Sequence, residues 1–261
     1  KDEDEVARIR RMGQITTAVV GQTAEFLVSH AVQDAVLVKK DGSPLTIGDV
    51  KEKINLWLAE RGAENPHGTI LSIGRDAAVP HTSGNPRDVL RLGQTIIFDI
   101  YPCEAGGGYY YDLTRTWCLG YAPDDALALY EDVLAAYQAV RTQLCADAPL
   151  RIYQEMVCKL FQERGHPTLQ EDPLTERGYV HGLGHGVGLY LHQDPFFRLG
   201  TPDSQVLPEN AVVTVEPGLY YPERGLAVRL EDTFWIEPGA AAKPLADYPL
   251  DLVLPLKKSH R

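Results

Sequence analysis

The chain has 261 residues, of which 44% are hydrophobic and 23% charged, as in ordinary globular proteins. Acidic residues outnumber basic ones by 36 to 25 and no basic stripe is present, which disfavours a nucleic-acid-binding surface. No apolar run approaches the roughly 20 residues that a membrane-spanning helix needs, and the opening KDEDEVARIRR is too charged for a signal peptide. Four cysteines without a CxxC pair favour a reducing, cytoplasmic compartment.

The first half of the chain is predicted to contain two helices and three strands. Residues 2–30 carry acidic side chains in the first turn, where the helix dipole favours negative charge, followed by an apolar stripe at helical spacing. After a turn at 38–44, a second helix is expected from Thr46 to a terminal glycine at Gly62. Strands are expected at 69–74, 94–102 and 109–117, with a loop at 75–86 and a glycine-rich bend before the last strand.

The second half is predicted to begin with helices and to end with strands. Helices are expected at 123–146 and 151–164, and Gly165 and Pro167 stop the second of them. Residues 179–192 lead into a strand, 193–210 form a loop, strands follow at 211–216 and 225–237, and a proline-interrupted tail at 240–261 wraps the surface.

Two stretches of the chain resemble each other in order and composition. A helix ending in ERG precedes a strand in both, and LGQTIIFDI in the first stretch resembles LPENAVVTVEP in the second. The match places Asp99 opposite Glu216 and Asp112 opposite Glu231. It indicates two related α/β halves, each contributing a hairpin with a carboxylate on each strand. Chance similarity between apolar strands is the alternative.

Four carboxylates therefore lie in apolar strand sequences, as FDI, YDL, VEP and LED. If they converged without compensation, like-charge repulsion would protonate some of them or unfold the site. Two divalent cations, roughly 3.5–4 Å apart, would neutralise the four negative charges. The sequence thus predicts a metal site built from both halves.

One histidine is expected to complete this site. In HGLGH the glycines around His185 let other backbone approach closely. An imidazole among carboxylates suits Mn²⁺, Co²⁺, Fe²⁺ or Zn²⁺ better than Ca²⁺. Such a site lowers the pKa of bound water toward ~7 and favours hydrolysis of an amide or ester, with Glu216 taking and returning the proton. Three further histidines are candidates for contacting the oxyanion and the leaving amine: His81, His181 and His192.

Two arginines are also expected to act at this site. Arg229 lies two residues before Glu231, so both point to one face of a strand, and we expect it to pair with a ligand carboxylate. Arg198 follows His192 in a loop and would bind a substrate carboxylate bidentately. A solvated loop arginine is the alternative for Arg198.

With these residues in view, the chain resembles the pita-bread metallopeptidases, and within them the Xaa-Pro branch of aminopeptidase P and prolidase. The resemblance runs from KDEDEVARIRR through VRLEDTFWI. It implies an α+β pita-bread (creatinase/aminopeptidase) fold, in which two pseudo-symmetric α/β halves form a curved antiparallel sheet covered by helices. Residues 1–261 would be a single catalytic domain, without the N-terminal domain that Xaa-Pro enzymes carry. The resemblance rests on five matched ligands in order: Asp99, Asp112, His185, Glu216 and Glu231.

The resemblance also implies what the matched ligands hold. Asp112 and Glu231 would bridge two divalent metal ions. Asp99 would complete one ion, and His185 with Glu216 would complete the other. Mn²⁺ is the first expectation for the metal, with Zn²⁺ or Co²⁺ as alternatives.

Substrate contacts are implied in the same way. His192 matches the catalytic histidine that steadies the substrate carbonyl, and His81 matches the one near the scissile-bond nitrogen. His181 would line the proline pocket, and Arg229 is also expected at the substrate side of the site. Tyr111 lies in GGGYYY, an insertion that makes the first hairpin longer than is usual in the family, and it either contacts substrate or packs in the core.

The expected function is that of a dinuclear metallo-exopeptidase that hydrolyses the Xaa-Pro bond at the N-terminus of dipeptides or short peptides. One alternative is a methionine aminopeptidase-like enzyme, against which His181 and the long first helix argue. Another is a pita-bread binding module that has lost catalysis, against which the intact ligand set argues. The expected partners are proline-containing peptides and a second copy of the chain in a homodimer, without nucleic acid or membrane.

Overall fold

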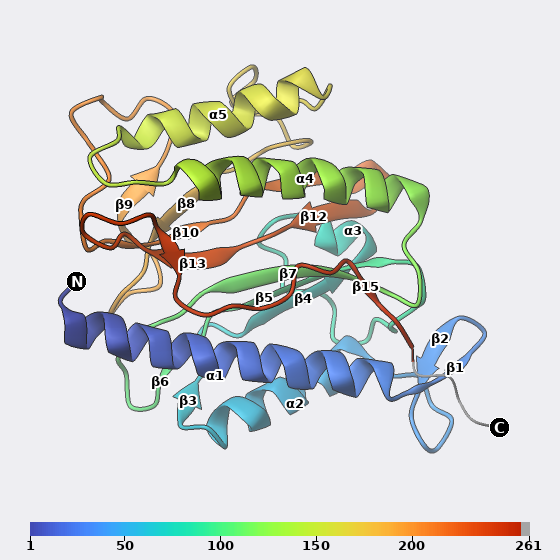
Figure 1. Ribbon diagram of the computed structural model, residues 1–261. Helices are drawn as coiled ribbons and strands as arrows, with labels where there is room; N and C mark the ends of the chain where they lie inside the picture. The colour runs from blue at the N-terminus through green and yellow to red at the C-terminus, as the bar shows by residue number, and fades with distance from the viewer. Residues whose placement is uncertain (257–261) are drawn as a thin grey trace.

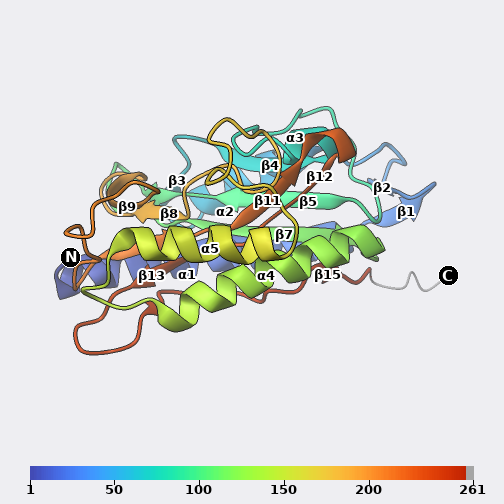
Figure 2. The same cartoon turned by 90° about the horizontal axis from the view of Figure 1, so that it is seen from above.

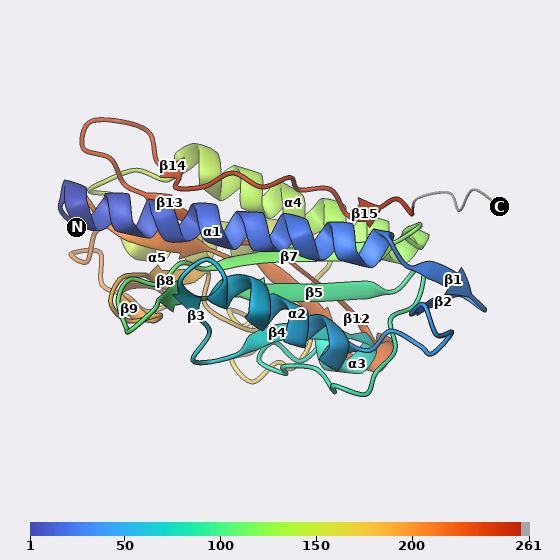
Figure 3. The same cartoon turned by 90° about the horizontal axis from the view of Figure 1, so that it is seen from below.

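The computed structural model describes residues 1–256 and places two sheets between two pairs of helices. Helices α4 (Asp124–Gln143) and α5 (Leu150–Glu163) lie on one side of the sheets, as Figure 1 shows and as the view from above in Figure 2 confirms. Helices α1 (Glu3–Val28) and α2 (Ile47–Ala59) cover the opposite side, where α1 runs along the strands (Figure 3). The predicted helices are therefore present, with ends shifted by a few residues.

The first half is built around a four-stranded sheet in the order β15-β7-β5-β4. Neighbouring strands are antiparallel except for the last strand of the chain, which runs parallel to β7. The strands of this half are β1 (Ala31–Gln33), β2 (Val36–Val38), β3 (Ala63–Glu64), β4 (Thr69–Ile73), β5 (Thr95–Ile100), β6 (Cys103–Glu104), β7 (Leu113–Leu119) and β15 (Val253–Leu254), and its short helix is α3 (Gly74–Ala77).

The second half is built around a five-stranded antiparallel sheet in the order β14-β13-β10-β8-β9, with a separate β11–β12 hairpin beside it. Its elements are β8 (Gly184–Gly186), β9 (Gln193–Phe197), β10 (Val212–Val215), β11 (Gly218–Tyr221), the 3₁₀ turn η1 (Pro222–Arg224), β12 (Leu226–Arg229), β13 (Asp232–Trp235) and β14 (Lys243–Pro244).

Both N-terminal helices begin with reciprocal caps. In α1 the Asp2 carboxylate accepts a hydrogen bond from the Glu5 amide at 2.8 Å, and the Glu5 carboxylate accepts one from the Asp2 amide at 2.8 Å. Thr46 and Asp49 form the same capping box at the start of α2. Each box satisfies two of the orphan N–H groups of a helix start, typically worth about 1 kcal/mol. The boundary at Thr46 was predictable for this reason.

The hydrophobic core follows the two-half division. One cluster joins α1 and α2 to β4, β5 and β7, and a second joins α4 and α5 to the second sheet. Within residues 1–256 no helix combines the length and apolar content needed to cross a bilayer. Each of the four cysteines is a free thiol.

Three expected boundaries were wrong. The predicted loop at 75–86 starts inside a one-turn helix, α3, whose Ala77 packs in a small third core cluster. The predicted loop at 193–210 begins with strand β9, which Pro195 concealed because proline is tolerated only at a sheet edge or bulge, and β9 is an edge strand. The returning strand of the first hairpin begins at Leu113 and not at Tyr109.

The predicted strand at 225–237 is divided into β12 and β13, and the break has a structural reason. Residues up to Arg229 pair with β11, and residues from Asp232 pair with β10. Between them Glu231 leaves both partners, and its amide donates to the Thr114 carbonyl at 3.0 Å. The break therefore lies where the second half meets β7 of the first. The predicted tail at 240–261 contributes β14 and β15, and its last five residues lie outside the described part.

Tyr111 is a core residue, which resolves the two expectations for it in favour of packing. Its side chain is fully buried, and its hydroxyl donates to the Ala246 carbonyl at 3.4 Å. The ring lies directly against Gly13 of α1, where an added Cβ would come within 2.6 Å of it. The predicted contact between Tyr111 and substrate is therefore wrong, because α1 covers this ring.

Replacing Gly13 tests this contact between α1 and the hairpin. Gly13→Ala should lower the free energy of unfolding by about 1–3 kcal/mol, since the methyl group overpacks the Tyr111 ring. Gly21→Ala is the matched control in the same helix, because its Cβ would meet its nearest neighbour at an ordinary 3.7 Å. The control should gain up to about 1 kcal/mol from helix propensity. Urea unfolding measures both, and equal stability of the two variants would contradict the packing described.

Candidate metal centre

The two halves of the chain meet at Thr114 and Glu231. The Thr114 hydroxyl donates to Glu231 Oε2 at 2.7 Å, in addition to the backbone bond between the two residues. This contact holds the segment between β12 and β13 against the start of β7. Asp112, two residues before Thr114, is thereby brought beside Glu231.

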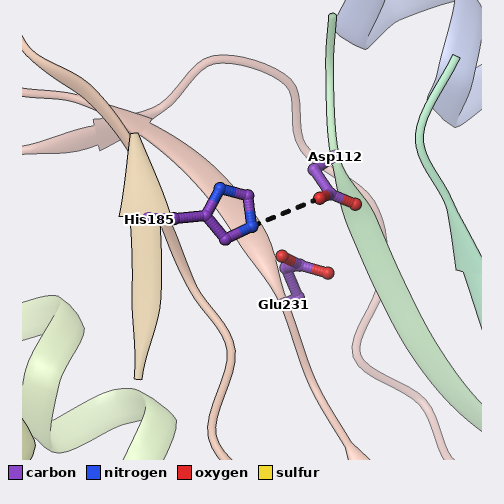
Figure 4. Close-up of side chains that lie close together, drawn as sticks. All are labelled: Asp112, His185 and Glu231. Atoms are coloured by element: carbon purple, nitrogen blue, oxygen red, sulfur yellow. Dashed lines mark ion pairs between the residues drawn. The ribbon is translucent and has the colours of Figure 1, made fainter. Parts of the chain in front are cut away.

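Asp112, His185 and Glu231 form a cluster with metal-ligand character. Each offers one ligand atom, and these atoms lie within 4.8 Å of one another (Figure 4). His185 points from β8 toward Asp112, with 3.6 Å between its Nε2 and Asp112 Oδ2. Glu216 is near as well, with 3.4 Å from His185 Nε2 to Glu216 Oε1. All five residues predicted as ligands, Asp99 included, line one cavity of about 620 Å³.

Glycines and one threonine position His185. A Cβ on Gly184 would come within 2.1 Å of the Thr214 carbonyl oxygen, so only glycine lets β8 lie this close to β10. The Thr214 hydroxyl accepts from the His185 amide at 3.0 Å and donates to Glu216 Oε1 at 3.3 Å. One side chain thus fixes the backbone of the histidine and the carboxylate of the glutamate.

His185 is held neutral with a free ring nitrogen. Its Nδ1 lies 3.1 Å from the Gly186 carbonyl oxygen, to which it donates, and this leaves Nε2 unprotonated. Burial, and next the neighbouring His192, lower the pKa of His185 to about 4. An unprotonated imidazole nitrogen aimed at carboxylates is the form that binds a metal ion.

The carboxylates carry unpartnered buried oxygens. Asp99 Oδ1, Asp112 Oδ1 and Glu231 Oε1 have no hydrogen-bond partner. Burial, followed by the neighbouring carboxylates, raises the pKa of Asp112 and of Glu231 well above its ordinary value. Burial also raises the pKa of Glu216 to about 8. Buried like charges are costly unless a cation compensates them, so the donor set fits divalent metal ions.

Arg229 supplies the one full positive charge paired with this group in the described structure. It is buried, and its Nη2 donates to Asp99 Oδ2 at 2.7 Å. Its Nε lies 3.3 Å from Thr114 Oγ1, at the junction of the halves. The expected pairing of Arg229 with one of the predicted ligand acids is present, and it involves the acid of the other half.

Tyr220 is a site residue that the sequence interpretation missed. Its buried hydroxyl accepts from Arg229 Nη1 at 2.8 Å and lies 2.9 Å from His181 Nε2. The register of the β11–β12 hairpin, which pairs Gly218 with Arg229, puts Tyr220 diagonally beside the arginine. Recognising the turn in PERG would have revealed this neighbour.

A second buried arginine supports the junction from behind. Arg115 is 1% exposed, and its Nη1 donates to the carbonyl oxygens of Thr114 at 2.9 Å and Glu231 at 2.7 Å. Its Nη2 donates to Asp232 Oδ1 at 2.8 Å. Because these N–H groups of Arg115 each have an acceptor at hydrogen-bond distance, the buried guanidinium charge is compensated. The sequence interpretation did not identify this residue.

The predicted histidines and Arg198 all line the cavity. His192 is exposed, with its ring centroid 4.3 Å from that of His185. His81 is exposed on the loop after α3. The guanidinium of Arg198 lies 4.2 Å from the centroid of the Phe196 ring. The lining residues that were not predicted include His67, Tyr101 and Tyr190.

His181 should remain neutral in the folded protein. Its Nδ1 donates to the Gly182 carbonyl at 2.7 Å, its Nε2 accepts from Tyr220, and burial lowers its pKa to about 3. Since the unfolded value is about 6.5, the unfolded chain binds the proton first, and stability falls as pH drops below about 6.5. In a ¹H–¹³C NMR titration, the His181 Cε1 signal, assigned with His181→Gln, should not shift between pH 7 and 5. A midpoint near 6.5 would contradict this environment.

Comparison with known proteins places the chain in a family. The sequence pattern of metallopeptidase family M24 matches residues 7–238. An Xaa-Pro dipeptidase from Pyrococcus furiosus is 30% identical over 196 residues, which are 75% of this chain and 52% of that protein. The chain thus spans about half the length of this curated relative.

Solved structures share the fold. A prolidase from Pyrococcus furiosus matches with a TM-score of 0.79 and 25% identity, over 95% of this chain and 65% of that one. An X-Pro aminopeptidase from Thermotoga maritima matches with a TM-score of 0.79 and 23% identity, over 97% of this chain and 64% of that one. The predicted α+β pita-bread fold is confirmed.

Proposed function

The chain belongs to metallopeptidase family M24, and from this premise we propose that it hydrolyses the Xaa-Pro bond at the N-terminus of dipeptides or short peptides. The observation that carries the proposal is the cavity in which four acids and a neutral imidazole converge, with unpartnered oxygens on three of the acids. The names of the relatives, Xaa-Pro dipeptidase and prolidase, support the choice of substrate.

We propose that two divalent metal ions bind in this cavity, with Mn²⁺ as the first choice and Zn²⁺ or Co²⁺ as alternatives. Asp112 and Glu231 would be shared, Asp99 would serve one ion, and His185 with Glu216 would serve the other. The three unpartnered carboxylate oxygens and the free Nε2 of His185 support this assignment. When bound, the ions neutralise the acids and acidify a water molecule that acts as the nucleophile.

The remaining residues would handle protons and charge. Glu216 would take and return the proton, which suits a carboxylate whose pKa is raised to about 8 and whose side chain is 18% exposed to the cavity. His192 would steady the substrate carbonyl, and His81 would contact the scissile nitrogen; both are accessible from the cavity. His181 would line the proline subsite as a neutral ring held by Tyr220.

The two arginines would act differently. Arg198 is exposed at the cavity wall and would bind the carboxylate of a dipeptide. Arg229 lines the cavity too, but its guanidinium is occupied by Asp99, Tyr220 and Thr114. We therefore propose that Arg229 mainly holds Asp99 in position and contributes less to substrate contact.

We also propose a cellular compartment and an oligomeric state for the enzyme. We place it in the cytoplasm, because four free thiols suit a reducing compartment. A homodimer is carried over from the family resemblance as a hypothesis for solution measurements.

Removing the proton acceptor tests the proposed function. With Ala-Pro as substrate and added Mn²⁺, Glu216→Gln should lower kcat by at least about 100-fold, the usual effect of losing a general base. Glu223→Gln is the matched control, since Glu223 is exposed and lies outside the cavity. Near-normal turnover in Glu216→Gln would refute the assignment. Wild-type protein without activity on any Xaa-Pro peptide under Mn²⁺, Zn²⁺ or Co²⁺ would favour a binding module.

Replacing Arg198 tests the carboxylate anchor. Arg198→Ala should raise KM for Ala-Pro by about tenfold or more, since a charge-assisted hydrogen bond is worth about 1.5–3 kcal/mol. The effect on Ala-Pro-Ala should be smaller, because its terminal carboxylate lies one residue further away. Arg224→Ala, at an exposed arginine outside the cavity, is the control. Equal effects on dipeptide and tripeptide would remove Arg198 as the anchor.

A further inference from the structure

A set of aromatic and apolar residues in the cavity lining has no role in the proposed chemistry. We call this set the aromatic wall, and it consists of His67, Ile70, Tyr101, Tyr190 and Leu191. Its position follows from the first sheet, where Ile70 of β4 pairs with Asp99 of β5. Ile70 therefore lies beside an acid of the first half, whereas Tyr190 and Leu191 come from the segment between β8 and β9 of the second half.

Tyr110 holds two members of this wall in place. Its hydroxyl lies 3.2 Å from His67 Nε2, and the two rings are stacked, with centroids 5.8 Å apart and planes 25° apart. Its backbone amide donates to the Gly188 carbonyl at 2.8 Å, two residues before Tyr190. A single residue thus fixes the orientation of His67 and anchors the segment that carries Tyr190.

The hairpin that carries Tyr110 is itself fastened to α1. The Tyr109 hydroxyl donates to Glu5 Oε1 at 2.7 Å, and Arg8 Nε donates to Glu104 Oε1 at 3.0 Å. The bend is formed by Gly106, whose φ of 83° favours glycine. These contacts make the hairpin a fixed support for the wall.

The groups assigned under the proposed function leave the residues of the aromatic wall for the first side chain of a dipeptide. Arg198 takes the substrate carboxylate and His181 lines the proline subsite, whereas the aromatic wall lines the same cavity without such a role. The first side chain then faces the wall of His67 and Tyr190. Tyr190 is 73% exposed, so an apolar substrate side chain that covers it gains hydrophobic burial.

We propose that His67, Tyr110 and Tyr190 determine specificity for the first residue of the substrate and favour aromatic side chains over small ones. The inference rests on the proposed function and adds the substrate class. His67 and Tyr190 contact the first side chain directly, and Tyr110 acts as a positioning residue through both.

The test compares kcat/KM for Phe-Pro and Ala-Pro with added Mn²⁺. The wild-type protein should prefer Phe-Pro by about tenfold, of the size expected for aromatic contacts. His67→Ala should reduce this ratio on the order of fivefold, and Tyr110→Phe, which keeps the ring and loses the hydroxyl, by about threefold. Both losses should come from KM for Phe-Pro, because the contact is made equally in ground and transition states.

Two matched controls separate a specificity role from a structural one. His30→Ala removes a histidine whose ring lies edge-on to Phe26, and Tyr121→Phe removes the hydroxyl of an exposed tyrosine, but neither residue lines the cavity. Both controls should keep the wild-type ratio. Hydrolysis of both dipeptides with the same ratio in His67→Ala and Tyr110→Phe as in wild type would overturn this inference alone. Hydrolysis of neither dipeptide by the wild type would overturn the proposed function and the inference with it.

Discussion

The contact between Thr114 and Glu231 is the constraint on which the rest of the site depends. By joining β7 to the second half, it brings Asp112 and Glu231 within ligand distance of each other and of His185. The same contact confines like charges in a buried place, where burial raises the pKa of each of the two carboxyl groups. Repulsion between these buried carboxylates therefore destabilises the metal-free fold, and divalent cations would offset this repulsion.

The sequence singled out the four acids and the histidine that line the cavity, because charged residues in apolar strands are rare enough to stand out. It also predicted the helices, whose caps and apolar periodicity are local signals. It missed β9, since Pro195 hides an edge strand, and it missed the break before Glu231, since that break depends on pairing with the other half. Tyr220 and Arg115 act through long-range contacts that no short motif encodes.

Different parts of the scaffold hold the charged groups of the cavity and its aromatic wall. Strand ends and the junction of the halves hold the charged groups, which need fixed geometry. The aromatic wall instead depends on a hairpin fastened to α1 by Tyr109 and Arg8. Loops supported by a rigid frame vary without disturbing the core, so such a wall can change while the acids stay in place.

The central claim is that the buried acids are compatible with a stable fold because cations compensate them. The most direct measurement is the unfolding free energy of wild type and Asp112→Asn at pH 8, each without metal and with Mn²⁺. We predict that the metal-free variant is more stable than metal-free wild type by about 1 kcal/mol or more, since one buried like charge is removed. We further predict that Mn²⁺ stabilises wild type and leaves the variant nearly unchanged. A metal-free variant less stable than wild type, together with equal stabilisation of both by Mn²⁺, would contradict the account.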